Sequence, residues 1–432
     1  MAEKKEERLK LGLNLDDYVY EARHCDGQQH CRWIDLNYAR GIDFSWRCPP
    51  WQKELLNAYG ATGKCNLAYF MIKGKIDYSS PTLREAIYKD PLCGGCDTGC
   101  KRNLDHEIQL MLESMRARLV EKGYGPMPQH VPITENIEKS HNRYGLAQRK
   151  RFDWMPQNVK VTDKADILYF VGCRAAFVDT EIAIATARIL NAAKVDFMMM
   201  KDEPCCGHFV FITGQVEKAR KLAQDNLKLL RETGAKTVVF SCAEGYKTVK
   251  VDYPKLLNFP TSDLGFDVKH ITELVDPWVK EGRLKLSNRL DMKITYHDSC
   301  NLGRLSEPWI PWEGTIADYG RLSPPREVRR GVDGVYEPPR DILKAIPGIE
   351  LVEMLRRRDH AWCCGNDGGV KEAFPDFALW TAGERLREAA AITGAEAIVS
   401  ACPACKENFN DAAKDGIKAH DITELIAKAI GK

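Results

Sequence analysis

The sequence predicts an α/β protein in which a helical N-terminal domain precedes two similar units built on parallel sheets. From residue 165 onward, short apolar runs alternate with helical patterns, an order that is typical of parallel sheets. The same order of runs and cysteines occurs twice in this part, which indicates an internal duplication. Residues 1–150 lack the alternation and instead carry short helical patterns between seven of the sixteen cysteines.

Composition and charge argue against two classes of partner. The 432 residues include 63 basic and 61 acidic ones, so no overall charge attracts nucleic acid or an acidic membrane surface. The first residues are charged, and no apolar leader follows them. No run reaches the roughly 18 apolar residues that a membrane span requires. We therefore expect a soluble, cytoplasmic protein with no nucleic-acid partner and no membrane span.

The N-terminal domain is expected to cover residues 1–125. Its helical patterns fall at 51–60, 82–89 and 104–122, with the cysteines at helix ends and in loops. A polar, proline-containing stretch at 126–162 follows, and it has few apolar positions that would enter a core. This stretch is predicted to be the linker to the next domain.

Two units follow the linker, at 163–290 and 291–432. In the first unit, strands are expected at 166–171, 195–200 and 236–240, with helices at 180–193 and 215–233. In the second unit, strands are expected at 293–297, 351–354 and 397–400, with a helix at 374–391. Cysteines follow these strands, at the place where open α/β sheets bind ligands. The second unit also has an insertion around 304–335, rich in Trp, Pro, Gly and Arg, which we interpret as a lid or a docking loop.

Sixteen cysteines in a cytoplasmic protein need an explanation other than disulfides, because cytosolic thiols stay reduced. Each unit contains two adjacent cysteines followed by glycine, namely Cys205-Cys206-Gly207 and Cys363-Cys364-Gly365. Single cysteines stand before and after each of these elements. Thiolates at several strand ends favour iron–sulfur clusters. Zinc is the weaker interpretation, since a zinc site rarely uses adjacent thiolates.

The second unit offers five thiolates, which is more than one cubane cluster requires. Adjacent cysteines suit a larger assembly, because their side chains reach irons in different positions. We therefore expect this set to hold an unusual cluster and to be the redox centre. The five residues are Cys300, Cys363, Cys364, Cys402 and Cys405.

The first unit keeps only four of these cysteines, because Gly245 stands where the fifth would be. The four are Cys173, Cys205, Cys206 and Cys242. They suit an ordinary four-iron cube, a rearranged cluster or an empty site. His208 and Glu244 are close enough in sequence to replace the missing ligand, although each is also explained as an ordinary neighbour.

The N-terminal cysteines form two irregular runs of the ferredoxin kind. In paired-cluster ferredoxins the last cysteine of each run ligates the other cluster. On that rule one cluster is held by Cys48, Cys93 and Cys96, with Asp90 as fourth ligand. The other cluster is held by Cys25, Cys31 and Cys100. Cys65 completes either set or is simply a buried thiol, and Asp90 is also explained as an ordinary loop residue.

These motifs resemble the Cys-Cys-Gly family of iron–sulfur oxidoreductases, which includes the catalytic subunit of heterodisulfide reductase. Beyond the cysteine pattern, the resemblance rests on segments spread over nearly the whole chain. They are Cys93–Asp97, Cys100–Asp105, Tyr296–Arg304, Pro339–Arg340, Ile346–Glu350, Phe374–Pro375 and Ala401–Pro403. The chain looks most like soluble members with two ferredoxin-like clusters. One of these is the heterodisulfide-reductase-like subunit of the ATP-independent benzoyl-CoA reductase complex.

The resemblance implies two cubane 4Fe-4S clusters in the N-terminal domain and a non-cubane 4Fe-4S cluster on each complete five-cysteine motif. It also implies disulfide reduction between two such non-cubane clusters. Only the set that contains Cys363 and Cys364 matches the complete motif. A further cluster in the first unit follows less directly, because Gly245 departs from the family pattern.

Two functions are consistent with the sequence. We expect an electron-transfer subunit of a multi-subunit oxidoreductase, whose partners are a flavoprotein, other iron–sulfur subunits, or both. The chain has neither a GxGxxG motif after a strand nor a P-loop, so flavin or NAD would bind to a partner. The alternative is a thiol–disulfide reductase that acts on a small disulfide at the C-terminal cluster, with His297, His360 and Lys406 as proton donors.

Overall fold

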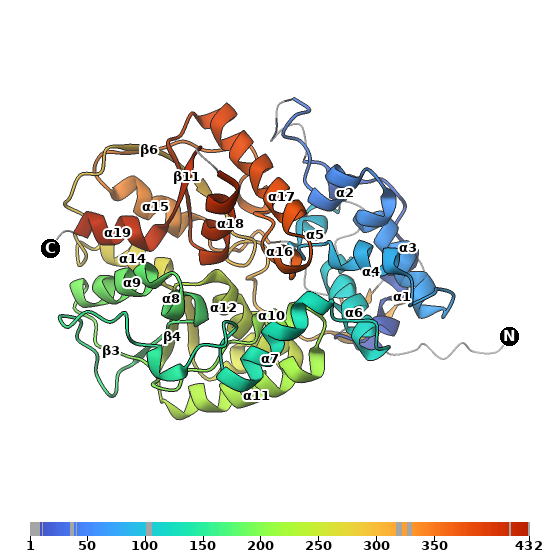
Figure 1. Ribbon diagram of the computed structural model, residues 1–432, viewed down its shortest axis with the longest axis horizontal. Helices are drawn as coiled ribbons and strands as arrows, with labels where there is room; N and C mark the ends of the chain where they lie inside the picture. Colours follow the sequence, from blue (N-terminus) through green and yellow to red (C-terminus); the bar gives the residue numbers. More distant parts are fainter. Residues whose placement is uncertain are drawn as a thin grey trace.

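The structure is a computed structural model that describes residues 9–10, 12–34, 39, 41–100, 106–316, 322–325, 331–413 and 416–430. The N-terminal helices lie at one end of the molecule, and two α/β units lie at the other, one above the other in Figure 1. The mixed α/β class with parallel sheets, predicted from the sequence, is confirmed.

Short helices form the N-terminal part. They are α1 (Val19–Arg23), α2 (Pro49–Glu54), α3 (Ala61–Ile72), α4 (Pro81–Tyr88), α5 (Gly95–Gly99) and α6 (Ile108–Glu121). Helices α2 and α4 begin with proline, whose fixed φ suits the first turn. The stretch expected to be a linker contains a further helix, α7 (Val131–Ser140), in which Ile137 is buried. The ferredoxin-like character of this part and the limits of the domains stay predictions.

The first unit is a parallel sheet in the order β3-β2-β4-β5. Its strands are β2 (Ile167–Phe170), β3 (Phe197–Met198), β4 (Thr237–Phe240) and β5 (Asp267–His270). The connecting helices are α9 (Thr180–Ala192), α11 (Val216–Glu232) and α14 (Ile271–Lys280). The central strands β2 and β4 are almost continuously apolar, since helices cover both faces of a parallel sheet.

The second unit repeats this topology in the order β9-β6-β10-β11. Its strands are β6 (Met292–His297), β9 (Ile349–Leu351), β10 (Ala397–Ser400) and β11 (Lys418–Asp421). The helices between and after them include α15 (Glu337–Ala345), α17 (Pro375–Glu388), α18 (Pro403–Ala413) and α19 (Ile422–Ile430). Numbered along the chain, the strands of both sheets run 2-1-3-4. This shared order supports the expected duplication.

The two units pack against each other through equivalent helices. Helix α9 of the first unit contacts α19, and α14 contacts α15. Helices α9 and α15 each follow the first strand of their sheet, while α14 and α19 each follow the last. The pairing is therefore reciprocal, as in the contact of a two-fold symmetric dimer.

Part of the expected insertion lies outside the described residues. Within the described part, β7 (Glu313–Ile316) pairs antiparallel with β8 (Leu322–Ser323) and with the N-terminal strand β1 (Leu9–Lys10). The insertion thus pairs with residues Leu9–Lys10 of the N-terminal part. Over the described ranges, every helix is too short or too polar to cross a bilayer.

Candidate iron–sulfur sites

The five cysteines of the second unit meet at one end of its sheet. Cys300 follows β6, Cys402 follows β10, and Cys405 lies in the first turn of α18. Strands β6 and β10 are neighbours at the point where the strand order reverses, which is where such sheets bind ligands. Hydrogen bonds between thiols connect Cys363 with Cys300 and Cys364, and Cys405 with Cys364 and Cys402. All five residues are buried.

Glycine is required after the two adjacent cysteines. Gly365 has φ +85°, a left-handed conformation, and a Cβ there would lie 2.7 Å from the carbonyl oxygen of Ala378 and from Cβ of Thr381. The tight turn brings the Gly365 N–H within 3.2 Å of the Cys363 sulfur, to which it donates. The Cys-Cys-Gly element therefore directs both thiols inward by its backbone shape.

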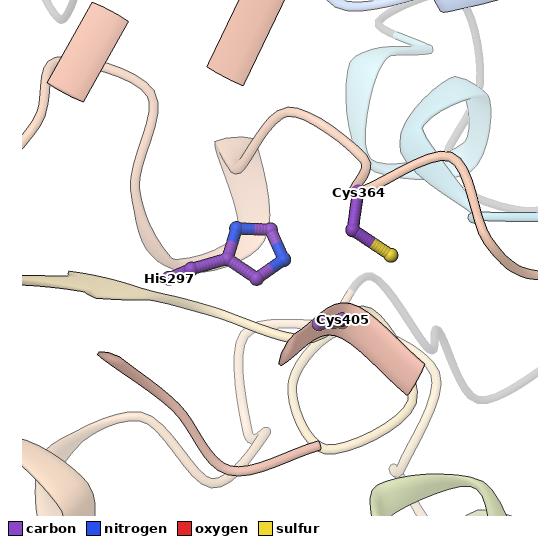
Figure 2. Close-up of side chains that lie close together, drawn as sticks. All are labelled: His297, Cys364 and Cys405. Carbon is purple, nitrogen blue, oxygen red and sulfur yellow. The ribbon is translucent and has the colours of Figure 1, made fainter. Parts of the chain in front are cut away.

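His297, the last residue of β6, lies among these thiols. A ring nitrogen of His297 and the sulfurs of Cys364 and Cys405 all lie within 4.8 Å of one another. Figure 2 shows the imidazole beside Cys364 and above Cys405. Hydrogen bonds with Cys363, Cys405 and His297 hold the pKa of Cys364 well below its ordinary value, although burial opposes this. Burial lowers the pKa of His297, although the hydrogen bond with Cys364 opposes this.

One N-terminal cysteine reaches the same place. Cys93 packs directly with Cys300 and Cys363, with Leu305 beside them. A hydrogen bond with Cys363 is the main cause that lowers the pKa of Cys93 to about 6 against the effect of burial, and Arg304 adds to it. The sequence assigned Cys93 to an N-terminal set. The contact with Cys363 across the boundary was not foreseen.

Arg304 joins these two groups of thiols. Its side chain donates to the carbonyl oxygens of Cys93, Asp359 (2.9 Å) and Ala361 (2.6 Å). Burial opposes its charge, but the thiols of Cys93, Cys300 and Cys363 raise the pKa of Arg304. A fixed positive charge thus lies between the N-terminal and C-terminal thiols. Arg304 belongs to the segment Tyr296–Arg304, which carries the family resemblance. Nothing else in the sequence indicated a role for this residue.

The ferredoxin rule assigned three of the N-terminal thiols to one cluster, and the structure brings these three together. Cys25, Cys31 and Cys100 line one cavity. Cys65, fully buried on α3, hydrogen-bonds with Cys25 and thereby lowers the pKa of Cys25 to about 6. The structure thus brings Cys65 to this group.

The second N-terminal group lies around Cys48. Burial of its thiol raises the pKa of Cys48 to about 12, although the nearby Lys64 opposes the rise. Lys64 is itself buried and forms an ion pair with Asp90. Asp90 also accepts a hydrogen bond from the Leu92 N–H at 2.8 Å. Cys96 lies within electrostatic range of Asp90 and Cys93.

In the first unit, the remaining thiols also share a cavity, which is lined by Cys173, Cys205, Cys206 and Cys242 together with His208 and Glu244. Gly207 repeats the turn of the second unit, with φ +84° and an N–H that donates to Cys205 at 3.5 Å. Burial and then the charges of Glu244 and Cys402 raise the pKa of Cys242. Cys242 thus lies within electrostatic range of the second unit.

Two phenylalanines distinguish this site from its counterpart. In the second sheet the last register pair of the central strands is His297 with Ser400, whereas in the first it is Phe170 with Phe240. The two rings pack together with centroids 5.1 Å apart and line the cavity. A Cβ on Gly245 would lie 3.1 Å from the Phe240 ring. The Phe240 ring therefore crowds the position of the missing fifth thiolate.

The residues suggested as proton donors have different surroundings. His297 adjoins the thiols as described. The His360 Nδ1 is 2.7 Å from the Arg47 guanidinium, and Lys406 forms a 2.7 Å ion pair with Glu424. The ammonium group of Lys406 is therefore already paired with a carboxylate.

Comparisons with known proteins find the same two cysteine-rich units. The family model described as "CCG: Cysteine-rich domain" matches twice, at residues 167–249 and 326–410. One subunit of the dihydromethanophenazine:CoB–CoM heterodisulfide reductase of Methanosarcina acetivorans is 36% identical over 88% of this chain and 86% of its own length.

Two further relatives are longer proteins, of which this chain spans about half. The probable iron–sulfur-binding oxidoreductase FadF of Bacillus subtilis is 28% identical over 82% of this chain and 49% of its own length. The EtfAB:quinone oxidoreductase of Syntrophomonas wolfei is 27% identical over 80% and 47%. The particular likeness to the benzoyl-CoA reductase complex stays a prediction. The chain belongs to the heterodisulfide-reductase-like family of iron–sulfur oxidoreductases, and it carries the cysteine-rich domain of that family twice.

Proposed function

We propose that this chain is an electron-transfer subunit of a cytoplasmic multi-subunit oxidoreductase. It relays electrons between N-terminal clusters and a non-cubane four-iron cluster in the second unit. The observation that carries the proposal is the packing of Cys93 against Cys363 and Cys300. Because electron tunnelling slows steeply with distance, ligands in contact across the boundary suit a relay between the two parts.

The thiol groups supply the ligand sets for this proposal, since Cys thiolates are the ordinary ligands of iron–sulfur clusters. One cubane is held by Cys25, Cys31, Cys65 and Cys100. A second is held by Cys48, Cys93 and Cys96 with Asp90, for which Asp90 must exchange its ion pair with Lys64. The non-cubane cluster is held by Cys300, Cys363, Cys364, Cys402 and Cys405. The first unit holds at most one further cluster, of another type, on Cys173, Cys205, Cys206 and Cys242.

When bound, such clusters accept and donate single electrons, and charge and burial around them set their potentials. The chain itself buries the thiols and provides positive charge beside them. Arg304 is the clearest example, since it faces thiols of both parts. Flavin or nicotinamide chemistry is left to a partner, for which a flavoprotein is proposed. The name of the EtfAB:quinone oxidoreductase relative fits such an arrangement.

A second candidate is reduction of a small disulfide at the C-terminal centre. Two electrons and two protons convert a disulfide into two thiols as the S–S bond breaks. The name of the Methanosarcina relative and the position of His297 beside Cys364 favour this reaction. The Phe240 ring counts against it, because it crowds the position that a fifth thiolate would need in the first unit.

The two candidates differ in what the isolated chain does. Anaerobically purified, cluster-loaded chain is mixed with reduced methyl viologen and a series of small disulfides, and viologen oxidation is followed by absorbance. A relay subunit is expected to become reduced once and then to show no disulfide-dependent turnover. It is also expected to co-purify with a flavoprotein from its native source. Sustained turnover by the isolated chain would overturn the relay and favour the reductase.

Replacing Arg304 by glutamine is expected to lower the midpoint potential of the non-cubane cluster, because a positive charge stabilises the reduced state. A unit charge about 8 Å away in a medium of effective dielectric constant about 20 contributes roughly 2 kcal/mol. For one electron this is roughly 90 mV. EPR-monitored redox titration measures the shift. Arg304→Lys should retain most of the potential, and the exposed Arg289→Gln should leave it unchanged. Equal potentials in Arg304→Gln and the wild type would contradict the assignment.

A further inference from the structure

Four polar side chains lie where the two units face each other, and each comes shortly after a cysteine of one of the thiol sets. His208 and Glu244 belong to the first unit, where they follow Cys206 and Cys242 by two residues. Asn301 and Asp367 belong to the second unit, where they follow Cys300 by one residue and Cys364 by three. None of the four is a thiol, so they form a group distinct from the proposed cluster ligands.

The side chains converge closely. One donor atom each from His208, Glu244 and Asp367 lies within 4.8 Å of the other two. His208 Nε2 is 3.0 Å from a carboxylate oxygen of Asp367, and His208 Nδ1 is 3.0 Å from the Thr248 hydroxyl. Both His208 and Asp367 are buried. Thr248 thus fixes the ring so that Nε2 points toward the carboxylates, as a partner of a metal-binding histidine commonly does.

Two oxygens of this group lack partners. Asn301 is 2% exposed, and its amide nitrogen donates to Asp367 at 2.6 Å, but its amide oxygen has no hydrogen-bond partner among the described residues. The Glu244 carboxylate is half-buried and lines the cavity of the first unit, and no hydrogen bond or ion pair joins it to a described residue. A buried oxygen without a partner costs roughly 1–3 kcal/mol. Such groups call for a bound ion or water.

The charges around the group leave room for a cation. Glu244 and Asp367 are carboxylates, and two buried cations, Lys247 and Arg116, lie within electrostatic range of Asp367. Arg116 donates to backbone carbonyl oxygens, among them that of Gly368. Lys247 is already held by Asp252 in a 2.8 Å ion pair. Arg143 and Arg174 line the same cavity as Glu244 and lie within electrostatic range of it. Arg143 is paired with Glu372, and Arg174 is paired with Asp179 and Glu407. The carboxylates of the group are therefore not neutralised by a direct partner other than His208.

We propose that His208, Glu244, Asn301 and Asp367 bind one divalent transition-metal ion, such as Mn²⁺, Fe²⁺ or Zn²⁺, between the two units. One imidazole nitrogen with carboxylate and amide oxygens is a donor set that suits these ions. The ion replaces the hydrogen bond between His208 and Asp367. The amide oxygen of Asn301 and a carboxylate oxygen of Glu244 also coordinate it. It joins the two units and adds positive charge between their thiol sets. This site does not depend on the proposed electron relay.

Manganese titration of the cluster-loaded chain tests the proposal. The protein is purified anaerobically and freed of loosely bound metal. Free Mn²⁺ is then measured by the six-line EPR signal at room temperature. We expect one Mn²⁺ per chain, displaced by Zn²⁺, and at least tenfold weaker binding in Asp367→Asn and in Glu244→Gln. The matched control Asp411→Asn removes an exposed carboxylate of the second unit and should bind as the wild type does.

The remaining outcomes are also decisive. Iron and sulfide contents show whether each variant still carries its clusters, and Asn301→Ala replaces Asp367→Asn if that variant loses them. A wild-type chain that binds neither Mn²⁺ nor Zn²⁺ would overturn the proposal. Equal Mn²⁺ affinity in Glu244→Gln and in the wild type would do so as well. Because the readout is metal binding, failure of the electron relay in turnover experiments leaves this result unaffected.

Discussion

Replacing Cys364 by serine is expected to abolish the EPR signal of the non-cubane cluster and to leave the signals of the N-terminal clusters in place. Cys364 touches Cys363, Cys405 and His297 at the centre of the five-thiol set, and its ionised thiol is the form that binds iron. A serine hydroxyl stays protonated and is a poor ligand there. Loss of a residue that merely supports a ligand costs about 10–100-fold in affinity or activity. Removal of the ligand itself should exceed about 100-fold in electron transfer.

The control is the equivalent cysteine of the first unit. Cys206→Ser changes the same position of the Cys-Cys-Gly element but leaves all five thiols of the second unit untouched. It should therefore retain the non-cubane signal at full intensity. An unchanged spectrum in Cys364→Ser would refute the five-cysteine assignment. Loss of the signal in both variants would point to a cluster shared between the units.

Gly365→Ala is expected to destabilise the second unit strongly. The left-handed backbone costs roughly 1–2 kcal/mol for a residue with a Cβ, and overpacking costs roughly 1–3 kcal/mol more. The overpacking arises because that Cβ would lie 2.7 Å from the Ala378 carbonyl oxygen and from Cβ of Thr381. We expect the apparent melting temperature to fall by on the order of 5–15 °C. Circular dichroism and cluster absorbance, recorded during heating, measure the fall.

Gly383→Ala is the matched control for this change. Gly383 lies within α17, and a Cβ there would have nothing within 4 Å. Alanine favours the helix over glycine by roughly 0.5–1 kcal/mol, so this variant should be slightly more stable than the wild type. If both variants lowered the melting temperature equally, the second unit would be sensitive to any glycine-to-alanine substitution. The proposed role of the turn at Gly365 would then be disproved.

The sequence predicted the central strands well and the sheet edges poorly. Strands β2, β4, β6 and β10 lie where continuous apolar runs indicated them, because both faces of a central strand are buried. Strands β5 and β11 were missed. Both mix polar and apolar residues, as in Asp267–His270, and lie at an edge where one side is open. Strand β9 begins at Ile349, two residues before the expected run.

In the two α/β units the cysteines could be placed from the sequence, because the apolar runs before them mark where strands end. Spacing could not predict which cysteines of different sets contact one another. The packing of Cys93 against Cys363 depends on how α5 and the loop before Cys363 dock, and no local pattern encodes that. The Phe170–Phe240 pair could have been found. Alignment of the two units at their cysteines places Phe170 opposite His297 and Phe240 opposite Ser400. Asp367 had no sequence signal of its own, since two of its neighbours, His208 and Glu244, lie in the other unit.

The reciprocal packing of α9 on α19 and of α14 on α15 has a consequence for how the two halves came to differ. In a symmetric pair of identical subunits, both halves are copies from one gene, so every change appears in both sites at once. Joining the halves in a single polypeptide removes that constraint. One half can then exchange a thiolate for Gly245 and fill the space with phenylalanine, while the other keeps its complete set. Covalent fusion thus permits the two sites to differ in their thiols and in their function, although the architecture around them is otherwise symmetric.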